Sequence, residues 1–98
     1  MSVRKPIRAI LEISSYIRTL PPELKRRIHK ALDQIRMLPD EGKPLQRELS
    51  GYRSYRVGTF RIIYRVTVRE IELIAVGPRR TIYEEAVKLT EMQSEKKP

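Results

Sequence analysis

The hydrophobic pattern of this chain changes its period once, between Pro39 and Gly51, and this change limits the folds open to it. Upstream, apolar residues such as Leu24, Ile28 and Ala31 recur every three or four positions, which is typical of an amphipathic helix. Downstream, apolar and polar residues alternate with the period of a β-strand. Helices followed by strands predict an α+β domain with the helices on one face of a sheet and the other face, or its rim, open.

Prolines set the bounds of two predicted helices. Pro6 suits the first position of a helix, and an apolar stripe follows over residues 7–20. The pair Pro21 and Pro22 ends that helix, because a residue before proline is pushed out of the helical region. Pro22 then opens a second helix that ends at Pro39. The sequence therefore predicts an N-terminal αα-hairpin.

Three strands are predicted after a polar loop over residues 40–51, in which Leu45 and Leu49 contact the core. The strands cover residues 53–57, 60–68 and 71–76, and tight turns between them make an antiparallel meander. Gly77 and Pro78 break the last strand, and a short C-terminal helix follows over about residues 82–92. We expect residues 1–98 to form a single domain that frays over residues 1–5 and 93–98.

Arginine is concentrated in the predicted sheet. Residues 47–80 include eight arginines and no lysine, and tyrosines are interleaved with them. A guanidinium group can bind phosphate oxygens two at a time and can stack on a base. The net charge of +9 predicts attraction to a polyanion, of which nucleic acid is the commonest, although an acidic protein would be attracted too. A basic face without a ligand is the alternative.

The composition excludes several classes of protein and site. There is no cysteine and only one histidine, His29, so disulfides, cysteine-based zinc sites and histidine clusters are excluded. We expect no metal or cofactor. No apolar run approaches the roughly 20 residues that span a bilayer. The N-terminal segment has basic residues followed by apolar ones, as a signal peptide does, but Glu12 and Arg18 interrupt its apolar part. A signal peptide is therefore not expected, and the protein is expected to be cytoplasmic.

One segment resembles a known family. The run LSGYRSYRVGTFRIIYRVTVREIELIAVGPRRTIYEEA is similar to the signature half of the RelE/ParE toxin superfamily, and LPPELKRRIHKAL is similar to the family's second helix. The shared features occur in order along the chain: Leu49 and Gly51; Arg56 and Gly58; the strand Phe60 to Tyr64; Val76 and Gly77; Arg79, Arg80 and Tyr83.

The chain departs from the family pattern in two places. Many relatives begin with a strand, but only Met1 to Lys5 precede Pro6, so this strand is expected to be vestigial. Relatives often carry histidine where this chain has Pro78, which has no proton to exchange. A mechanism that uses a histidine at this position is therefore not expected.

The resemblance implies a type II toxin held inactive in a hetero-oligomer with an acidic antitoxin. RelE-type members cut mRNA in the ribosomal A site and so inhibit translation. ParE-type members share the fold, lack that catalytic set and poison DNA gyrase. Arg61, Arg79 and Tyr83 favour a RelE-like, ribosome-dependent endoribonuclease, with ribosome and mRNA as partners. A gyrase inhibitor and a non-catalytic RNA-binding module remain open.

Cleavage of RNA without a metal uses the 2′-hydroxyl as nucleophile, and it needs a base for that hydroxyl, cations for the phosphorane charge and an acid for the 5′-oxygen. Arg61 and Arg79 are the expected phosphate clamps, supported by Arg53, Arg56 and Arg80. Arginine is a poor acid because its pKa lies above about 12. Tyr83 is therefore the candidate for proton transfer. We expect Arg56, Arg61, Arg79 and Tyr83 to line one basic surface.

Several of these side chains also have simpler interpretations. Tyr83 could stack on a base or pack at the start of a helix. Tyr64 shares a face with Phe60 and is expected in the core. Arg65 and Arg69 are expected to be solvated or to act only through their charge. His29 falls on the polar face of the second helix and is expected at the surface.

Overall fold

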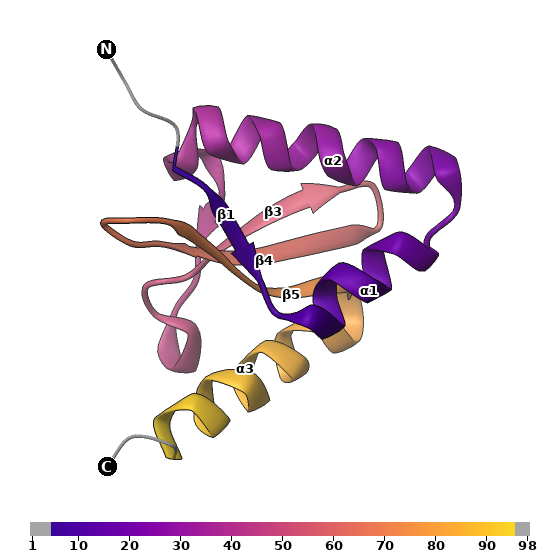
Figure 1. Ribbon diagram of the computed structural model, residues 1–98. Helices are drawn as coiled ribbons and strands as arrows, with labels where there is room; N and C mark the ends of the chain where they lie inside the picture. The colour runs from indigo at the N-terminus through magenta and orange to yellow at the C-terminus, as the bar shows by residue number, and fades with distance from the viewer. Residues whose placement is uncertain (1–4, 96–98) are drawn as a thin grey trace.

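The structure is a computed structural model that describes residues 5–95, without the side chains of residues 79–81 and 92–95. It is a five-stranded sheet in the order β1-β5-β4-β3-β2, packed between helices (Figure 1). The α+β prediction is confirmed. The strands are β1 (Ile7–Ala9), β2 (Lys43–Pro44), β3 (Arg53–Val57), β4 (Phe60–Val66) and β5 (Ile71–Pro78). The helices are α1 (Leu11–Thr19), α2 (Pro22–Met37) and α3 (Arg79–Glu95), with short 3-10 turns at Pro39–Glu41 and Arg47–Leu49.

The first helix starts later than predicted, because a strand precedes it. β1 pairs in parallel with β5, with Ile7 opposite Ile71, and the Ile71 N–H donates to the Pro6 carbonyl at 2.9 Å. The prediction that Pro6 opens a helix, and that the family strand is vestigial, is therefore wrong. Three residues are too few to separate a period of two from a helical stripe. The sheet is mixed, because β1 and β5 are parallel whereas the pairs β5-β4, β4-β3 and β3-β2 are antiparallel.

One face of the sheet carries the main core. α1 and α2 lie across this face (Figure 1). Ile28 and Ile35 of α2 are fully buried, and they share a cluster with Ile62 and Tyr64 of β4. The predicted alternation of β4 is confirmed, because Ile63 belongs to a separate cluster on the other face.

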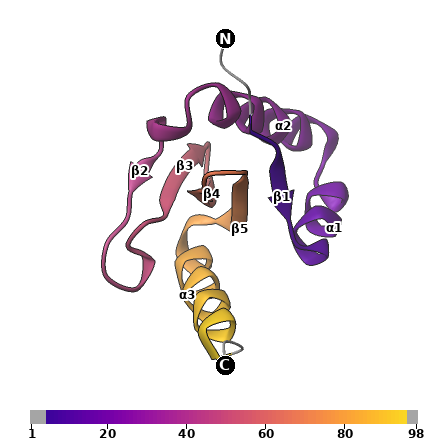
Figure 2. The same cartoon turned by 60° about the vertical axis from the view of Figure 1, so that its left-hand side comes forward.

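The second face is not open, because α3 packs on it. Figure 2 shows α2 and α3 on opposite sides of the sheet. Ile82 and Ala86 of α3 join Ile63 in the second core cluster. The prediction that the helices share one face is therefore wrong, and α3, at 17 residues, is not short. Gly77 permits this packing, because a β-carbon at that position would lie 3.2 Å from Ile82 Cδ1.

β5 continues to Pro78, beyond the break predicted at Gly77 and Pro78. Pro78 pairs with Phe60 of β4. Proline is tolerated there because β1 pairs with β5 only as far as Leu73, so the other edge of β5 has no described strand beside it. A bulge near Ile74 shifts the register, and it places Gly77 opposite Arg61.

The loop before β3 is attached to the core at several points. The Tyr64 hydroxyl donates to the Pro39 carbonyl at 2.7 Å and accepts from the Gly42 N–H at 3.0 Å. Tyr64 is fully buried, which confirms its place in the core, and burial raises the pKa of its hydroxyl. Leu49 is buried and Leu45 packs against the second cluster, as predicted.

Only part of the predicted fraying falls on described residues. Lys5 Nζ donates to the Thr67 carbonyl at 2.7 Å, and α3 continues through Glu95. Residues 1–4 and 96–98 lie outside the described residues. Among the described residues, no helix has the length and apolar character required to cross a membrane.

Candidate nucleic-acid interface

Two arginines occupy adjacent strands at directly opposite positions. Arg56 on β3 and Arg61 on β4 are cross-strand partners, beside the tight turn that contains Gly58. Both side chains point to the face that α3 partly covers, because Ile63, two residues from Arg61, packs against α3. Arg56 is exposed and Arg61 is partly exposed. Like charges in this arrangement are unfavourable unless an anion lies between them.

The ion pairs of the described residues separate these two arginines from several others. Arg65 pairs with Glu72 at 2.5 Å, and Arg8 pairs with Glu70 at 3.4 Å. Within the described part of the chain no carboxylate pairs with Arg56 or Arg61. The Arg56 Nε donates only to the Gly58 carbonyl, at 3.3 Å, so its two terminal nitrogens are free of described partners.

Arg53 lies on the other face of the sheet. Its guanidinium donates to the carbonyls of Asp40 and Gly42 at 2.9 and 2.8 Å, and it lies 3.7 Å from the Asp40 carboxylate. These contacts attach the loop before β2 to β3. The structure does not bring Arg53 together with Arg56 and Arg61.

Arg65 is held by Glu72 and Tyr52 and is not freely solvated, so of its two predicted roles the electrostatic one fits the structure. Two of its nitrogens donate to Glu72 Oε1, and its guanidinium lies 5.1 Å from the centre of the Tyr52 ring. Burial acts to raise the pKa of Glu72, but the hydrogen bonds and charge of Arg65 outweigh it and hold that pKa below its usual value. Arg69, in the turn between β4 and β5, is exposed as predicted.

Tyr83 extends from the start of α3 to β3. Its hydroxyl lies 3.2 Å from Ser54 Oγ, and either group can be the donor. Ser54 precedes Arg56 by two residues and so lies on the same face of β3. Tyr83 therefore shares a face with the arginine pair. The backbone of Arg79 follows Pro78, which is opposite Phe60, but the side chains of Arg79 and Arg80 lie outside the described residues.

The structure adds two residues that sequence reasoning missed. Ser54 is one, and its only sequence signal is a small polar residue between bulky neighbours. Arg27 of α2 is the other, because a β-carbon built on Gly58 would lie 3.2 Å from its guanidinium. Arg27 thus adds a third cation near the β3–β4 turn. Its position in sequence, next to a buried residue of a helix, gave no sign of this.

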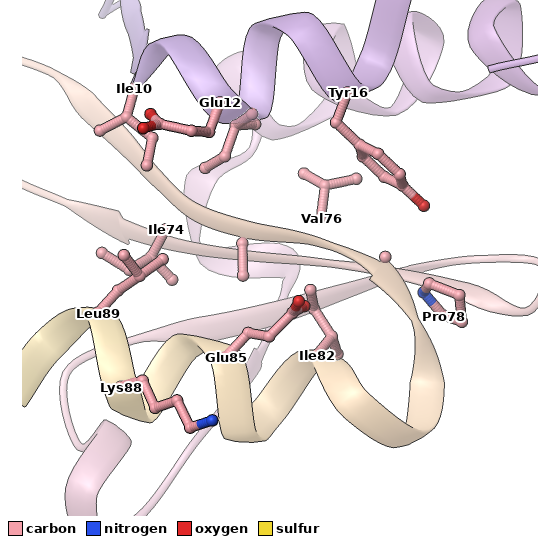
Figure 3. A pocket seen from close by; sticks show the side chains of 13 residues that line it. Ile10, Glu12, Tyr16, Ile74, Val76, Pro78, Ile82, Glu85, Lys88 and Leu89 are labelled. Carbon is pink, nitrogen blue, oxygen red and sulfur yellow. The ribbon is translucent and has the colours of Figure 1, made fainter. Parts of the chain in front are cut away.

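Other candidate sites lack the chemistry of a phosphate site. A groove of about 520 Å³ lies between α1 and α3 over the end of β5, with Ile74 and Val76 among its lining residues (Figure 3). Its charged lining residues, Glu12, Glu85 and Lys88, give no excess of positive charge. His29 is exposed, as predicted. Among the described residues, no three His, Cys, Asp or Glu side chains gather as a metal site would require.

Fold and site together define a small basic protein whose mixed sheet presents an arginine pair beside a helix that carries a tyrosine. The family described as the ParE toxin of the parDE type II toxin–antitoxin system matches residues 7–83. The chain belongs to the RelE/ParE superfamily of toxins of type II toxin–antitoxin systems. No curated protein matches it.

Solved structures agree with this assignment. A chain of the RelBE2 toxin–antitoxin complex from Mycobacterium tuberculosis is 30% identical with a TM-score of 0.68, and the match covers 79% of this chain and 100% of that one. A free RelE mutant from E. coli, 18% identical with a TM-score of 0.72 over 88% and 97% of the two chains, shares the fold. A chain of the archaeal RelE–RelB complex from Pyrococcus horikoshii also shares the fold. It is 20% identical with a TM-score of 0.64, and the match covers 80% of this chain and 98% of that one.

Proposed function

We propose that this toxin is an endoribonuclease that cuts mRNA on the ribosome, in the cytoplasm, without a metal or cofactor. The observation that carries the proposal is the cross-strand pair of Arg56 and Arg61, which has no described carboxylate partner. Elsewhere on the sheet, Arg53 and Arg65 are each placed beside an acid. A pair of cations that costs stability and lacks a described acid is best explained by a phosphate that binds between them.

In this proposal the attacking group belongs to the RNA. The 2′-hydroxyl gives its proton to solvent water as its oxygen forms a bond to the adjacent phosphorus, and the bond from phosphorus to the 5′-oxygen breaks. Arg61 and Arg56 hold the non-bridging oxygens, where negative charge grows in the transition state. Arg79 and Arg80, at the start of α3, are proposed to contribute further positive charge. The Tyr83 hydroxyl donates a proton to the departing 5′-oxygen.

The proposed partners follow from charge and family. The family comprises toxins of toxin–antitoxin systems, and two of the solved structures that share the fold are toxin–antitoxin complexes. A chain of net charge +9 would attract an acidic antitoxin over a long range. We propose that such an antitoxin binds this protein as a hetero-oligomer and keeps it inactive.

A gyrase inhibitor is the second candidate function. It is favoured by one observation, namely that the matching family is described as the ParE toxin. On this alternative the arginine pair would contact a protein or DNA, and Tyr83 would have only a packing role. A non-catalytic RNA-binding module would use the same surface without cutting.

Two experiments together separate these functions. One maps RNA 5′ ends after brief induction in cells, and the other tests the purified protein in a gyrase supercoiling assay. The proposal expects new 5′ ends within translated regions, their absence with Arg61→Gln, and unchanged supercoiling. Inhibited supercoiling with no new 5′ ends would replace the proposal with the gyrase alternative. If the protein binds RNA but produces neither new 5′ ends nor inhibited supercoiling, the non-catalytic RNA-binding module is the function that remains.

A further inference from the structure

Ser54 is 3% exposed, and apart from the tyrosines it is the one polar side chain that is buried among the described residues. Ile63 is its partner across the strands, and the face that they share is occupied by an apolar cluster that includes Tyr52 and Ile82. A hydroxyl in such surroundings costs free energy unless it is hydrogen-bonded. An apolar or β-branched residue would suit a buried strand position better. Packing alone therefore does not explain a serine here.

The hydrogen-bonding partner of this hydroxyl is Tyr83. The two oxygens lie 3.2 Å apart, and the contact joins β3 to the start of α3 across 29 positions of sequence. Ser54 precedes Arg56 by two residues on the same face of β3. The bond therefore places the end of the Tyr83 side chain on the strand that carries Arg56.

We propose that Ser54 is a positioning residue that holds the Tyr83 hydroxyl toward the phosphate bound by the arginine pair. The inference rests on the proposed ribonuclease function. A serine hydroxyl can both donate and accept, and its hydrogen rotates freely. When Ser54 donates to the Tyr83 oxygen, the proton of Tyr83 is free to point at the RNA.

The same bond persists through the chemical step. As phosphorus separates from the 5′-oxygen, that oxygen takes the Tyr83 proton and Tyr83 becomes a phenolate. Ser54 keeps its own proton and donates to the phenolate, and water later returns a proton to Tyr83. Ser54 thus acts only through Tyr83, which distinguishes it from a residue that contacts RNA.

A double-mutant cycle tests this role. The rate of cleavage of mRNA on purified ribosomes is measured for wild type, Ser54→Ala, Tyr83→Phe and the double variant. We expect Ser54→Ala to lower kcat about tenfold with little change in KM, which corresponds to the loss of one hydrogen bond. In the Tyr83→Phe background the same change should have no further effect on kcat.

Two further variants separate position from packing. Ser54→Thr keeps the hydroxyl and should restore kcat to within about threefold of wild type. Ser54→Cys keeps nearly the same size but is a weak hydrogen-bonding group, so it should lose activity as the alanine variant does. Ser54→Cys also serves if the alanine variant does not fold. Thermal melting of every variant confirms that the rates come from folded protein.

Two results would overturn the role while leaving the proposed function in place. One is an active wild-type enzyme with a silent Ser54→Ala change. The other is an equal loss of kcat from Ser54→Ala in both backgrounds, which would indicate a general structural effect. A wild-type protein that cuts no RNA under any of these conditions would overturn the proposed function, and the role of Ser54 with it.

Discussion

Arg56 on β3 stands directly opposite Arg61 on β4, whereas Arg65, further along β4, stands opposite Glu72 of β5. β4 therefore carries two arginines in different settings: Arg65 stabilises the sheet through an ion pair, whereas Arg61 faces a like charge. Binding sites commonly sacrifice stability in this way, because groups arranged for a ligand repel one another in its absence.

Replacing Arg56 should make the fold slightly more stable and RNA binding weaker. At low salt we expect Arg56→Gln to raise the free energy of unfolding by about 0.3 kcal/mol, because it removes the repulsion from Arg61. The matched control, Arg65→Gln, removes the same charge but should lower stability by about 1 kcal/mol through loss of the Glu72 pair. Urea unfolding measures both. Equal losses of stability would contradict the assignment of Arg56 to a ligand.

The Arg65–Glu72 pair also predicts a dependence of stability on pH. The pKa of Glu72 in the folded protein lies below its ordinary value of 4.5. A lowered carboxyl pKa adds stability that is complete above the ordinary pKa and is lost as pH falls through the folded one. At pH 7 Glu72→Gln should therefore be less stable than wild type by about 1 kcal/mol, and this gap should close below pH 4.5.

The control for this experiment is Glu91→Gln, which changes an exposed glutamate that makes no ion pair with a described residue. Its unfolding free energy should follow that of wild type across the range. A gap between wild type and Glu72→Gln that stays constant down to pH 3 would show that Glu72 contributes by packing and not by its charge.

The Tyr64 hydroxyl should contribute to stability and not to activity. Tyr64→Phe leaves the Gly42 N–H and the Pro39 carbonyl without their partner, so we expect a loss of about 1–2 kcal/mol. Tyr55→Phe is the matched control, because the Tyr55 hydroxyl makes no described hydrogen bond. Denaturant unfolding gives the two values. A reduced cleavage rate per folded molecule of Tyr64→Phe would indicate that the loop acts on the site.

The net charge of +9 should control the rate at which an acidic antitoxin associates. Salt screens attraction between exposed charges, so the association rate constant should fall steeply between about 0.05 and 0.5 M salt. Stopped-flow fluorescence gives this rate, and dissociation should change much less. An association rate that does not depend on salt would remove electrostatic attraction from the account of the partner.

The fold was largely predictable because each long element has one clear period. The stripe of Ile28 and Ile35 and the alternation of Ile62 and Tyr64 both matched the structure. β1 was missed because three residues carry too little periodicity. The packing of α3 on the second face was missed for another reason. Gly77 leaves room for this packing, but the lack of a side chain at that position can be interpreted only once Ile82 is known to lie beside it.

The candidate site was less predictable than the fold, because all of its arginines have the same sequence signature. Alternation along β3 separates Arg53 from Arg56, but the acids that pair with Arg53 and Arg65 come from other elements. Only the register of the strands shows that Arg61 has Arg56 as its neighbour. The Ser54 contact likewise needs the position of α3 over the sheet.

Arg61 and Arg69 provide the most direct test of the account. Arg61→Gln and Arg69→Gln each remove one positive charge, but Arg69 lies exposed in the β4–β5 turn, away from the proposed site. The measurement is the single-turnover rate of mRNA cleavage at saturating ribosome for both variants and wild type. We expect a loss of about a hundredfold for Arg61→Gln and less than about twofold for Arg69→Gln. Equal rates for the two variants would contradict the claim that Arg61 contacts the reacting phosphate.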